Sequence, residues 1–205
     1  MDVSLEYLRR KPAPDEINAM PLTRYDGDVR VIRSGEELAE VLPGLNCPGI
    51  LGFDTETRPS FAKGKKYPPS LIQLASADAV YLIQLEWLPF GKACADLLAN
   101  PEVVKVGAGI GDDMRALASA YPFVPRNAVD LGEMAALNKF QSRGLRTLAA
   151  SVFGWRISKG SQCSNWSLRD LAPKQIAYAA TDAWISRMLY LRMLELGLNR
   201  PENSP

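Results

Sequence analysis

The stretch GILGFDTETRPS, residues 49 to 60, is apolar as far as Phe53 and then presents two carboxylates, Asp54 and Glu56. An apolar run of this length predicts a buried strand. Residues two apart in a strand share a face and lie roughly 7 Å apart, so Asp54 and Glu56 point the same way. Two like charges on one face repel unless a cation joins them. At the end of a central strand the pair indicates a ligand set for Mg²⁺ or Mn²⁺, the alternative being a strand end whose carboxylates are hydrated by solvent.

Hydrophobic periodicity predicts a mixed α/β domain around this strand. Further strands are predicted at 29–32, 102–110 and 128–131, and a hairpin is predicted from 70–75 and 79–85. Helices are predicted at 34–42, 94–100, 111–121, 133–140, 145–154 and 173–197. Three prolines mark residues 1–26 as an irregular N-terminal arm, so the domain is expected over 27–200, followed by a tail at 201–205.

The composition suits one soluble domain of 205 residues, with 47% hydrophobic and 23% charged side chains. Three cysteines at wide, unpatterned spacing argue against a disulfide framework and favour a reducing compartment. The sequence shows neither a signal peptide nor a run of apolar residues long enough for a membrane span. We therefore expect a cytoplasmic protein without a membrane partner.

The chain contains no histidine. This absence excludes a Ser/His/Asp or Cys/His triad, an HExxH zinc site and a histidine general base. The chemistry must rest on carboxylates, tyrosine, lysine or bound metal.

A second stretch, KVGAGIGDDMRAL at 105–117, places three glycines after a predicted strand. The dinucleotide-binding fingerprint needs its third glycine where this chain has Asp112, so the match fails. What remains is a strand, a tight turn and a helix that opens with Asp112 and Asp113. Carboxylates suit the positive end of a helix dipole, so simple helix capping is the alternative to a role in a site.

A third stretch, QIAYAATDAW at 175–184, separates Tyr178 from Asp182 by four positions, which places them on one face of a helix. The alanines between and beside them are small. They would let the helix approach the sheet closely and bring a phenol and a carboxylate toward Asp54 and Glu56. The alternative is a tyrosine and an aspartate on a solvent-exposed face.

In this order the three stretches resemble the motifs of the DEDD superfamily of metal-dependent 3′–5′ exonucleases. FDTET is similar to its first motif, VGAGIGDDMRAL to its second and YAATDAW to its third, and the similarity covers roughly residues 28–196. The glycine-rich second motif and CSNWS at 163–167 resemble the Werner-type exonuclease domain more than ribonuclease D. The third motif carries Tyr178 where another subgroup has histidine, so the resemblance is to the tyrosine subgroup.

The resemblance implies a ribonuclease H-like fold with a central mixed sheet flanked by helices. It also implies two divalent cofactor ions, Mg²⁺ or Mn²⁺, about 4 Å apart. Asp54, Glu56 and Asp182 would hold the first ion. Asp54 would bridge to the second, which Asp113 would hold through water; Asp113 aligns with the family's motif and Asp112 does not. Tyr178 would orient the attacking water, and nucleoside 5′-monophosphates would leave from a 3′ end.

The expected partner is a nucleic acid with a free 3′ end, single-stranded or recessed, with DNA favoured over RNA. Residues 139–174 carry a net charge of +6 against −5 for the remainder, which fits one phosphate-contacting face. The basic loop 58–70 interleaves aromatic residues suited to base stacking, although it could equally be a solvated loop. Trp166 is also expected in the core. The candidate substrate contacts are Arg58, Lys63, Lys65, Lys66, Arg143, Lys159 and Trp166.

Two other classes of function stay open. One is a catalytically inactive nucleic-acid-binding module on the same fold, which the presence of all four carboxylates and Tyr178 disfavours. The other is a nucleotide-binding oxidoreductase or regulatory domain, which the failed glycine fingerprint disfavours. No appended nucleic-acid-binding domain is expected after residue 200, so substrate capture would come from the domain itself, an oligomer or a partner protein.

Overall fold

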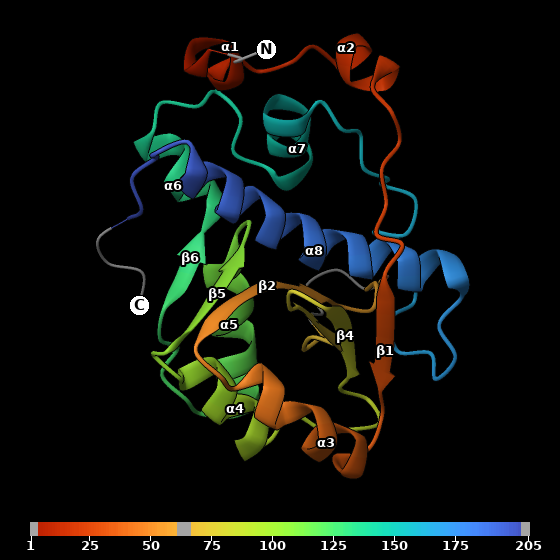
Figure 1. The fold of residues 1–205 in the computed structure, drawn as a ribbon. Helices are drawn as coiled ribbons and strands as arrows, with labels where there is room; N and C mark the ends of the chain where they lie inside the picture. Colours follow the sequence, from red (N-terminus) through yellow and green to blue (C-terminus); the bar gives the residue numbers. More distant parts are fainter. Residues whose placement is uncertain (1–3, 61–66, 202–205) are drawn as a thin grey trace.

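The computed structural model describes residues 4–60 and 67–201, and its centre is a six-stranded mixed sheet (Figure 1). In space the strands run in the order β1-β4-β3-β2-β5-β6. The strands are β1 (Asp28–Ile32), β2 (Gly49–Glu56), β3 (Leu71–Ala75), β4 (Ala79–Gln84), β5 (Val103–Gly107) and β6 (Ala128–Asp130). This arrangement confirms the predicted mixed α/β class.

Strand β2 lies in the interior of the sheet, between β3 and β5. It pairs antiparallel with β3, where Asp54 lies opposite Gln73, and parallel with β5, where Gly52 lies opposite Val106. The β3–β4 hairpin is present as predicted. Strand β5 ends at Gly107 rather than continuing to residue 110, because Gly109 adopts a left-handed conformation (φ 78°) and the next helix begins directly after it.

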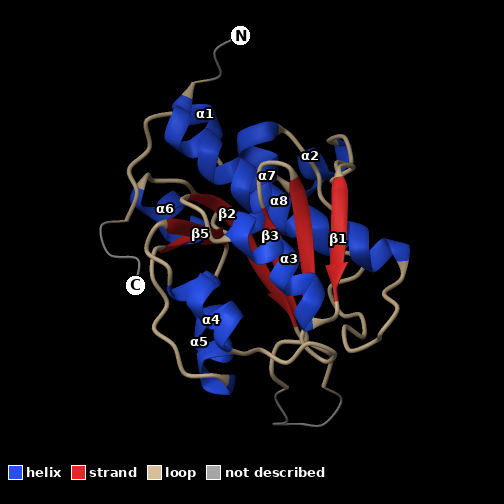
Figure 2. Cartoon of the chain, turned by 60° about the horizontal axis from the view of Figure 1, so that its bottom comes forward, coloured by secondary structure: helices blue, strands red, loops and turns tan. Residues whose placement is uncertain are grey.

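Helices cover both faces of the sheet (Figure 2). The first face packs against α3 (Gly35–Leu45), α4 (Lys92–Ala99) and α5 (Ile110–Ala120). The opposite face packs against α6 (Leu131–Leu137), α7 (Leu145–Phe153) and α8 (Pro173–Glu195). Ser34 and Glu37 form the predicted capping box at the start of α3.

Helix α8 is the longest helix of the described residues and lies directly across the sheet (Figure 1). Its small residues Ala179, Ala180 and Ala183 are fully buried against β3 and β4, which permits a close approach. A Cβ atom at Gly52 would overlap the carbonyl oxygen of Ala183. The backbone of α8 therefore rests on the backbone of β2, and this contact sets the position of everything that α8 carries.

The N-terminal arm was expected to be irregular, but it contains two short helices, α1 (Leu5–Arg9) and α2 (Pro14–Ala19). Pro14 occupies the first turn of α2, where its missing N–H costs nothing. Helix α1 buries Leu8 in the cluster that contains α7 and α8. The arm is thus packed onto the domain, a long-range association that local proline content does not report.

None of the helices in the described parts of the chain combines the length and the apolar character needed to span a bilayer.

Candidate active site

The carboxyl end of β2 opens into a cleft of about 780 Å³. Asp54 and Glu56 both line it, as the strand period predicts, and Thr55 between them turns toward α5. The other walls come from the β5–α5 turn, from α6 and α7, from residues 159 and 162, and from Tyr178 and Asp182 of α8. Segments that are distant in sequence therefore meet at one edge of the sheet.

The two neighbouring aspartates at the start of α5 have different surroundings. Asp113 is half-buried and accepts a hydrogen bond from the Thr55 hydroxyl at 2.5 Å, so it is tied to β2. Asp112 is exposed and pairs with Arg115 on the helix surface. Neither caps the helix, whose N-cap residue is Gly109. The structure therefore places Asp113 beside the β2 carboxylates and leaves Asp112 outside.

Tyr178 and Asp182 lie one turn apart on α8 and both face the cleft. Asp182 is only 5% exposed. The ring of Tyr178 packs against the buried indole of Trp166, with 6.0 Å between the ring centroids. The structure thus brings Asp54, Glu56, Tyr178 and Asp182 together in one cleft, with Asp113 behind Thr55.

Burial raises the pKa of every carboxyl group in this set, and the negative charges of the other members raise those of Asp54 and Glu56 further. Desolvation is the largest cause for each. The pKa of Asp54 is raised well above its usual range, also by the negative charges of Asp182, Asp113 and Glu56. The pKa of Glu56 rises to about 8 and that of Asp113 to about 6. The pKa of Asp182 rises to about 7, against the opposing effects of the Tyr178 hydroxyl and the Arg146 guanidinium. Arg146 is therefore the one cation that acts on the pKa values of these described carboxyl groups.

The phenol of Tyr178 has a raised pKa, first because it is buried and then because of the charges of Asp182 and Glu56. It therefore stays protonated at neutral pH and acts as a hydrogen-bonding group rather than as a base. Arg146 provides positive charge at the cleft wall, where its guanidinium donates to the carbonyl oxygen of Ile157 at 3.0 and 2.5 Å.

The donor set fits hard divalent cations, because it consists of carboxylates that repel one another and it contains no thiol or imidazole. The carboxylates are not prearranged as ligands: within residues 4–60 and 67–201, no three acidic or cysteine side chains are grouped closely enough to hold an ion. Asp113 is engaged by the Thr55 hydroxyl, and Asp54 accepts the backbone N–H of Thr55 at 2.8 Å. Cation binding would therefore require side-chain rotations at this strand end.

The predicted substrate contacts divide into two groups. Arg143 and Lys159 are exposed and line the cleft. Arg58 does not line it; its guanidinium lies 3.9 Å from the Tyr67 ring centroid and 4.0 Å from the Glu86 carboxylate. Lys63, Lys65 and Lys66 lie outside the described residues.

Trp166 requires a correction as a candidate substrate contact. Its side chain is 0% exposed and belongs to the cluster between α8 and the sheet, so no base can stack on it in this conformation. The alternative expectation, that Trp166 is a core residue, is the one the structure supports. Trp166 instead packs against the ring of Tyr178.

Sequence reasoning missed Thr55 and Arg146 as site residues. Thr55 lines the cleft between Asp54 and Glu56, and its hydroxyl donates to Asp113 on α5. Arg146 was counted only within the basic segment 139–174. Its position near the start of a helix could have indicated a role in the site. Arg146 is the second residue of α7, directly after Gly144, and helix N-termini commonly bind anions.

Raising the pH should destabilise the metal-free protein. The folded-state pKa values of Glu56, Asp113 and Asp182 lie above their ordinary values, so their contribution to stability is fully present below about pH 4 and is lost as the pH rises through about 6 to 8. We expect the melting temperature in EDTA to fall by roughly 5 to 10 °C between about pH 5.5 and about pH 8. Differential scanning fluorimetry measures this directly.

The matched control is Glu56→Gln, which removes one titrating group without changing the shape of the side chain. Its melting temperature should fall less steeply over the same interval, and saturating Mn²⁺ should flatten the wild-type profile. Parallel pH profiles for the two proteins in EDTA would show that the cluster does not govern the pH dependence.

Comparison with known proteins shows the family. Residues 29–197 match the model of a 3′–5′ exonuclease family. The human exonuclease 3′-5′ domain-containing protein 2 is 34% identical over 168 residues, which cover 76% of this chain and 26% of that protein. Ribonuclease D of Gluconacetobacter diazotrophicus is 32% identical over 176 residues, covering 82% and 43%. The mouse bifunctional 3′-5′ exonuclease/ATP-dependent helicase WRN is 30% identical over 159 residues, covering 75% and 11%. The chain therefore spans less than half of each relative.

Solved structures show the same fold. The EXO domain of Aedes aegypti Nibbler superimposes with a TM-score of 0.75 at 23% identity, covering 86% of this chain and 95% of that one. Trypanosoma brucei RNase D, in complex with RNA U12, superimposes with a TM-score of 0.72 at 23% identity, covering 88% and 64%. These likenesses confirm the ribonuclease H-like fold expected from the resemblance.

Both kinds of relative that the motifs resemble, Werner-type and ribonuclease D, are among the matches. The family model covers most of the chain, and the cleft gathers residues from all three motifs. The chain thus belongs to the 3′–5′ exonuclease family of the DEDD superfamily and is an exonuclease domain of that family.

Proposed function

We propose that this chain removes nucleotides one at a time from the 3′ end of a single-stranded nucleic acid and releases nucleoside 5′-monophosphates with the help of two divalent ions, Mg²⁺ or Mn²⁺. One observation carries the proposal: Asp54, Glu56, Tyr178 and Asp182, from two distant segments, line one cleft. The mutual repulsion of the carboxylates around Asp54 supports a role in binding cations.

Asp54, Glu56 and Asp182 would hold one ion, and Asp113 would contribute to the second after releasing Thr55. When bound, the pair of ions would supply the Lewis acidity that activates water and stabilises the leaving 3′ oxygen. Until an ion binds, the Thr55 hydroxyl holds Asp113 next to the end of β2.

Tyr178 would orient the attacking water through its protonated hydroxyl, while the buried Trp166 prevents the ring from moving away. Arg143 and Lys159 line the same cleft and would contact phosphate oxygens. Arg146 is held by the Ile157 carbonyl and offsets part of the negative charge around Asp182. Cationic side chains thus line the same cleft as the carboxylates.

The sugar preference remains a proposal with two candidates. The sequence led us to favour DNA. The relatives named ribonuclease D, and the solved RNase D with RNA U12, favour RNA. Discrimination between the two would rest on contacts to the 2′-hydroxyl group.

A 5′-labelled single strand, in DNA and in RNA form, should be shortened from its 3′ end into a ladder with Mg²⁺ or Mn²⁺ and remain intact in EDTA. Tyr178→Phe should slow the ladder by about 10²-fold, because the water loses the group that orients it. Gel electrophoresis of timed samples measures both effects, and the faster polymer identifies the preferred sugar.

Tyr121→Phe is the matched control, because Tyr121 packs edge-on against Phe90 at the end of α5, outside the residues that line the cleft. It should degrade the strand at the wild-type rate. If neither polymer is cleaved with any metal while binding persists, the chain is a binding module rather than an enzyme.

A further inference from the structure

The N-terminal arm crosses α8 beside the candidate active site. The N–H of Thr23 donates to the Arg156 carbonyl at 2.8 Å, and the Arg156 N–H donates to the Pro21 carbonyl at 3.0 Å. The N–H of Tyr25 donates to the Thr181 hydroxyl at 3.0 Å, next to Asp182. Figure 1 shows this segment descending from α2 past α8 to β1. Residues 21–25 are therefore fixed at a defined position on the helix that carries Tyr178.

Aromatic stacking holds the same segment in place. The ring of Tyr25 lies 5.8 Å from that of Trp184 on α8, and Trp184 stacks on Trp155 at 5.7 Å. The arm is thus anchored on both sides of Arg24, whose side chain is left exposed. Arg24 precedes residues 29–197, the part of the chain that matches the family model.

Between the arm and α8 lies a second cavity of about 350 Å³. It is lined by Leu22, Thr23 and Arg24 of the arm, by Ser158, Gly160 and Ser161, and by Lys174, Ala177, Tyr178, Thr181 and Asp182. Tyr178 and Asp182 also line the main cleft, so the two hollows meet at the proposed catalytic residues. Asp182 is the one carboxylate among the described residues that line the second cavity, whereas Arg24 and Lys174 supply two exposed cations.

An exonuclease must hold two parts of its substrate on either side of the scissile phosphate: the terminal nucleotide and the strand that continues from it. The structure has two cavities that share Tyr178. The larger is the main cleft, and the smaller is the second cavity, which is lined by the cations Arg24 and Lys174. On the basis of the proposed exonuclease function, we propose that Arg24 and Lys174 form a second nucleic-acid site, which binds the phosphates of the strand on the 5′ side of the scissile bond.

This site makes substrate length matter. A dinucleotide would fill the main cleft and reach little further, whereas a strand of about twelve nucleotides would also contact Arg24 and Lys174. Arg24→Glu should therefore reduce kcat/KM on the longer strand at least about tenfold more than on the dinucleotide, chiefly through a higher KM. Arg24→Lys should retain most of the wild-type preference for the longer strand in kcat/KM, because lysine keeps the positive charge.

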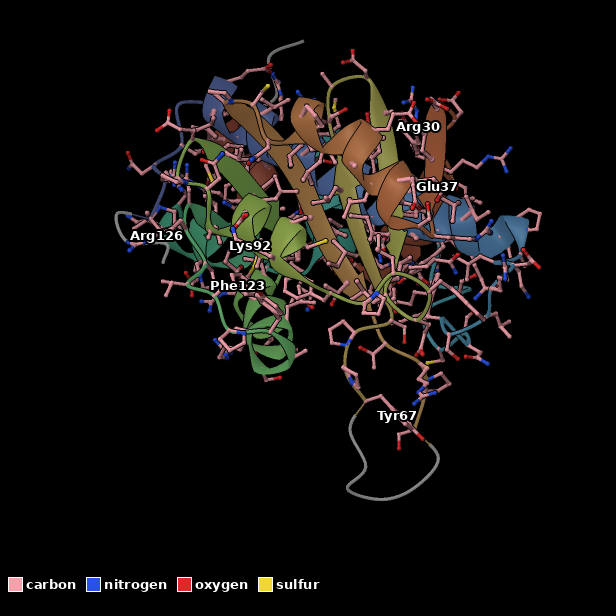
Figure 3. All side chains as sticks on the ribbon, turned by 90° about the horizontal axis from the view of Figure 1, so that it is seen from below. Arg30, Glu37, Tyr67, Lys92, Phe123 and Arg126 are labelled. Atoms are coloured by element: carbon pink, nitrogen blue, oxygen red, sulfur yellow. The ribbon has the colours of Figure 1, made fainter. Side chains whose placement is uncertain are left out.

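Binding provides a readout that does not depend on hydrolysis. Fluorescence anisotropy of a labelled single strand in EDTA should show weaker binding for Arg24→Glu, with the slope of log K against log salt reduced by about 1. Arg126→Glu is the matched control, because Arg126 is an exposed arginine that lines neither the main cleft nor the second cavity; it is labelled in Figure 3. It should leave the binding and the length preference unchanged.

The outcomes separate the two proposals. If the wild type degrades both substrates and Arg24→Glu behaves like Arg126→Glu, the second site is wrong and the exonuclease stands. If no substrate is degraded but Arg24→Glu still weakens binding selectively, the second site stands and the proposed activity is wrong. Equal binding by all variants overturns the second site in either case.

Discussion

Replacing Asp54 with asparagine is expected to lower the exonuclease rate by at least about 10³-fold. Asp54 is the carboxylate surrounded by the other three, since its pKa is raised by Asp182, Asp113 and Glu56 together. Asparagine can still accept the N–H of Thr55, which the aspartate accepts at 2.8 Å, so the strand end keeps its shape. Gel assays with Mg²⁺ and with Mn²⁺ measure the loss.

The same substitution should raise stability while it removes activity. In EDTA near pH 8 the variant should melt at a higher temperature than the wild type, because one buried like charge has been removed. Mn²⁺ should stabilise the wild type and have little effect on the variant. A variant that loses activity but is still stabilised by Mn²⁺ like the wild type would show that Asp54 does not hold the ion.

Asp112→Asn is the matched control for this experiment. Asp112 is the same residue type one helix position from Asp113, but it is exposed and paired with Arg115. Its loss should change neither activity nor the response to Mn²⁺. A large loss of activity in Asp112→Asn would overturn the choice of Asp113 as the α5 ligand.

Substituting Gly52 by alanine should destabilise the protein by about 3 kcal/mol and reduce activity in the fraction that remains folded. The added methyl group would overlap the Ala183 carbonyl oxygen, and backbone on both sides prevents easy relief. Either α8 lifts from β2 or β2 bends, and each movement separates Asp182 from Asp54. Urea denaturation gives the loss of stability, and the rate per folded molecule gives the effect on the site.

Gly44→Ala tests the effect of an added methyl group alone. Gly44 lies within α3, and a Cβ atom built there meets nothing within 4 Å. Alanine is a better helix former than glycine, so this variant should be neutral or slightly more stable. Equal stability of Gly52→Ala and the wild type would contradict the close contact between α8 and β2.

The parts of the site that follow from local periodicity were predictable from sequence. The strand period placed Asp54 and Glu56 on one face, and the helix period placed Tyr178 above Asp182. The small residues of α8 correctly indicated close packing on the sheet. These inferences succeed because each depends on neighbours within a few positions of the chain.

The parts that depend on tertiary contacts were not predictable. The hydrogen bond from Thr55 to Asp113 joins β2 to α5, and no local pattern indicates it. The burial of Trp166 under Tyr178 depends on how residues 163–167 fold beneath α8. Proline content suggested an irregular N-terminal arm, whereas the arm's position is set by hydrogen bonds to residues more than a hundred positions away.

The position of α8 in the chain also affects when the nuclease can first act. Tyr178 and Asp182 are synthesised more than a hundred residues after Asp54, and they reach it only when α8 docks on β2. Contacts of such large sequence separation form late in folding, because the loop they close is long. A nascent chain at the ribosome, close to messenger RNA, therefore lacks the complete proposed site until α8 has emerged.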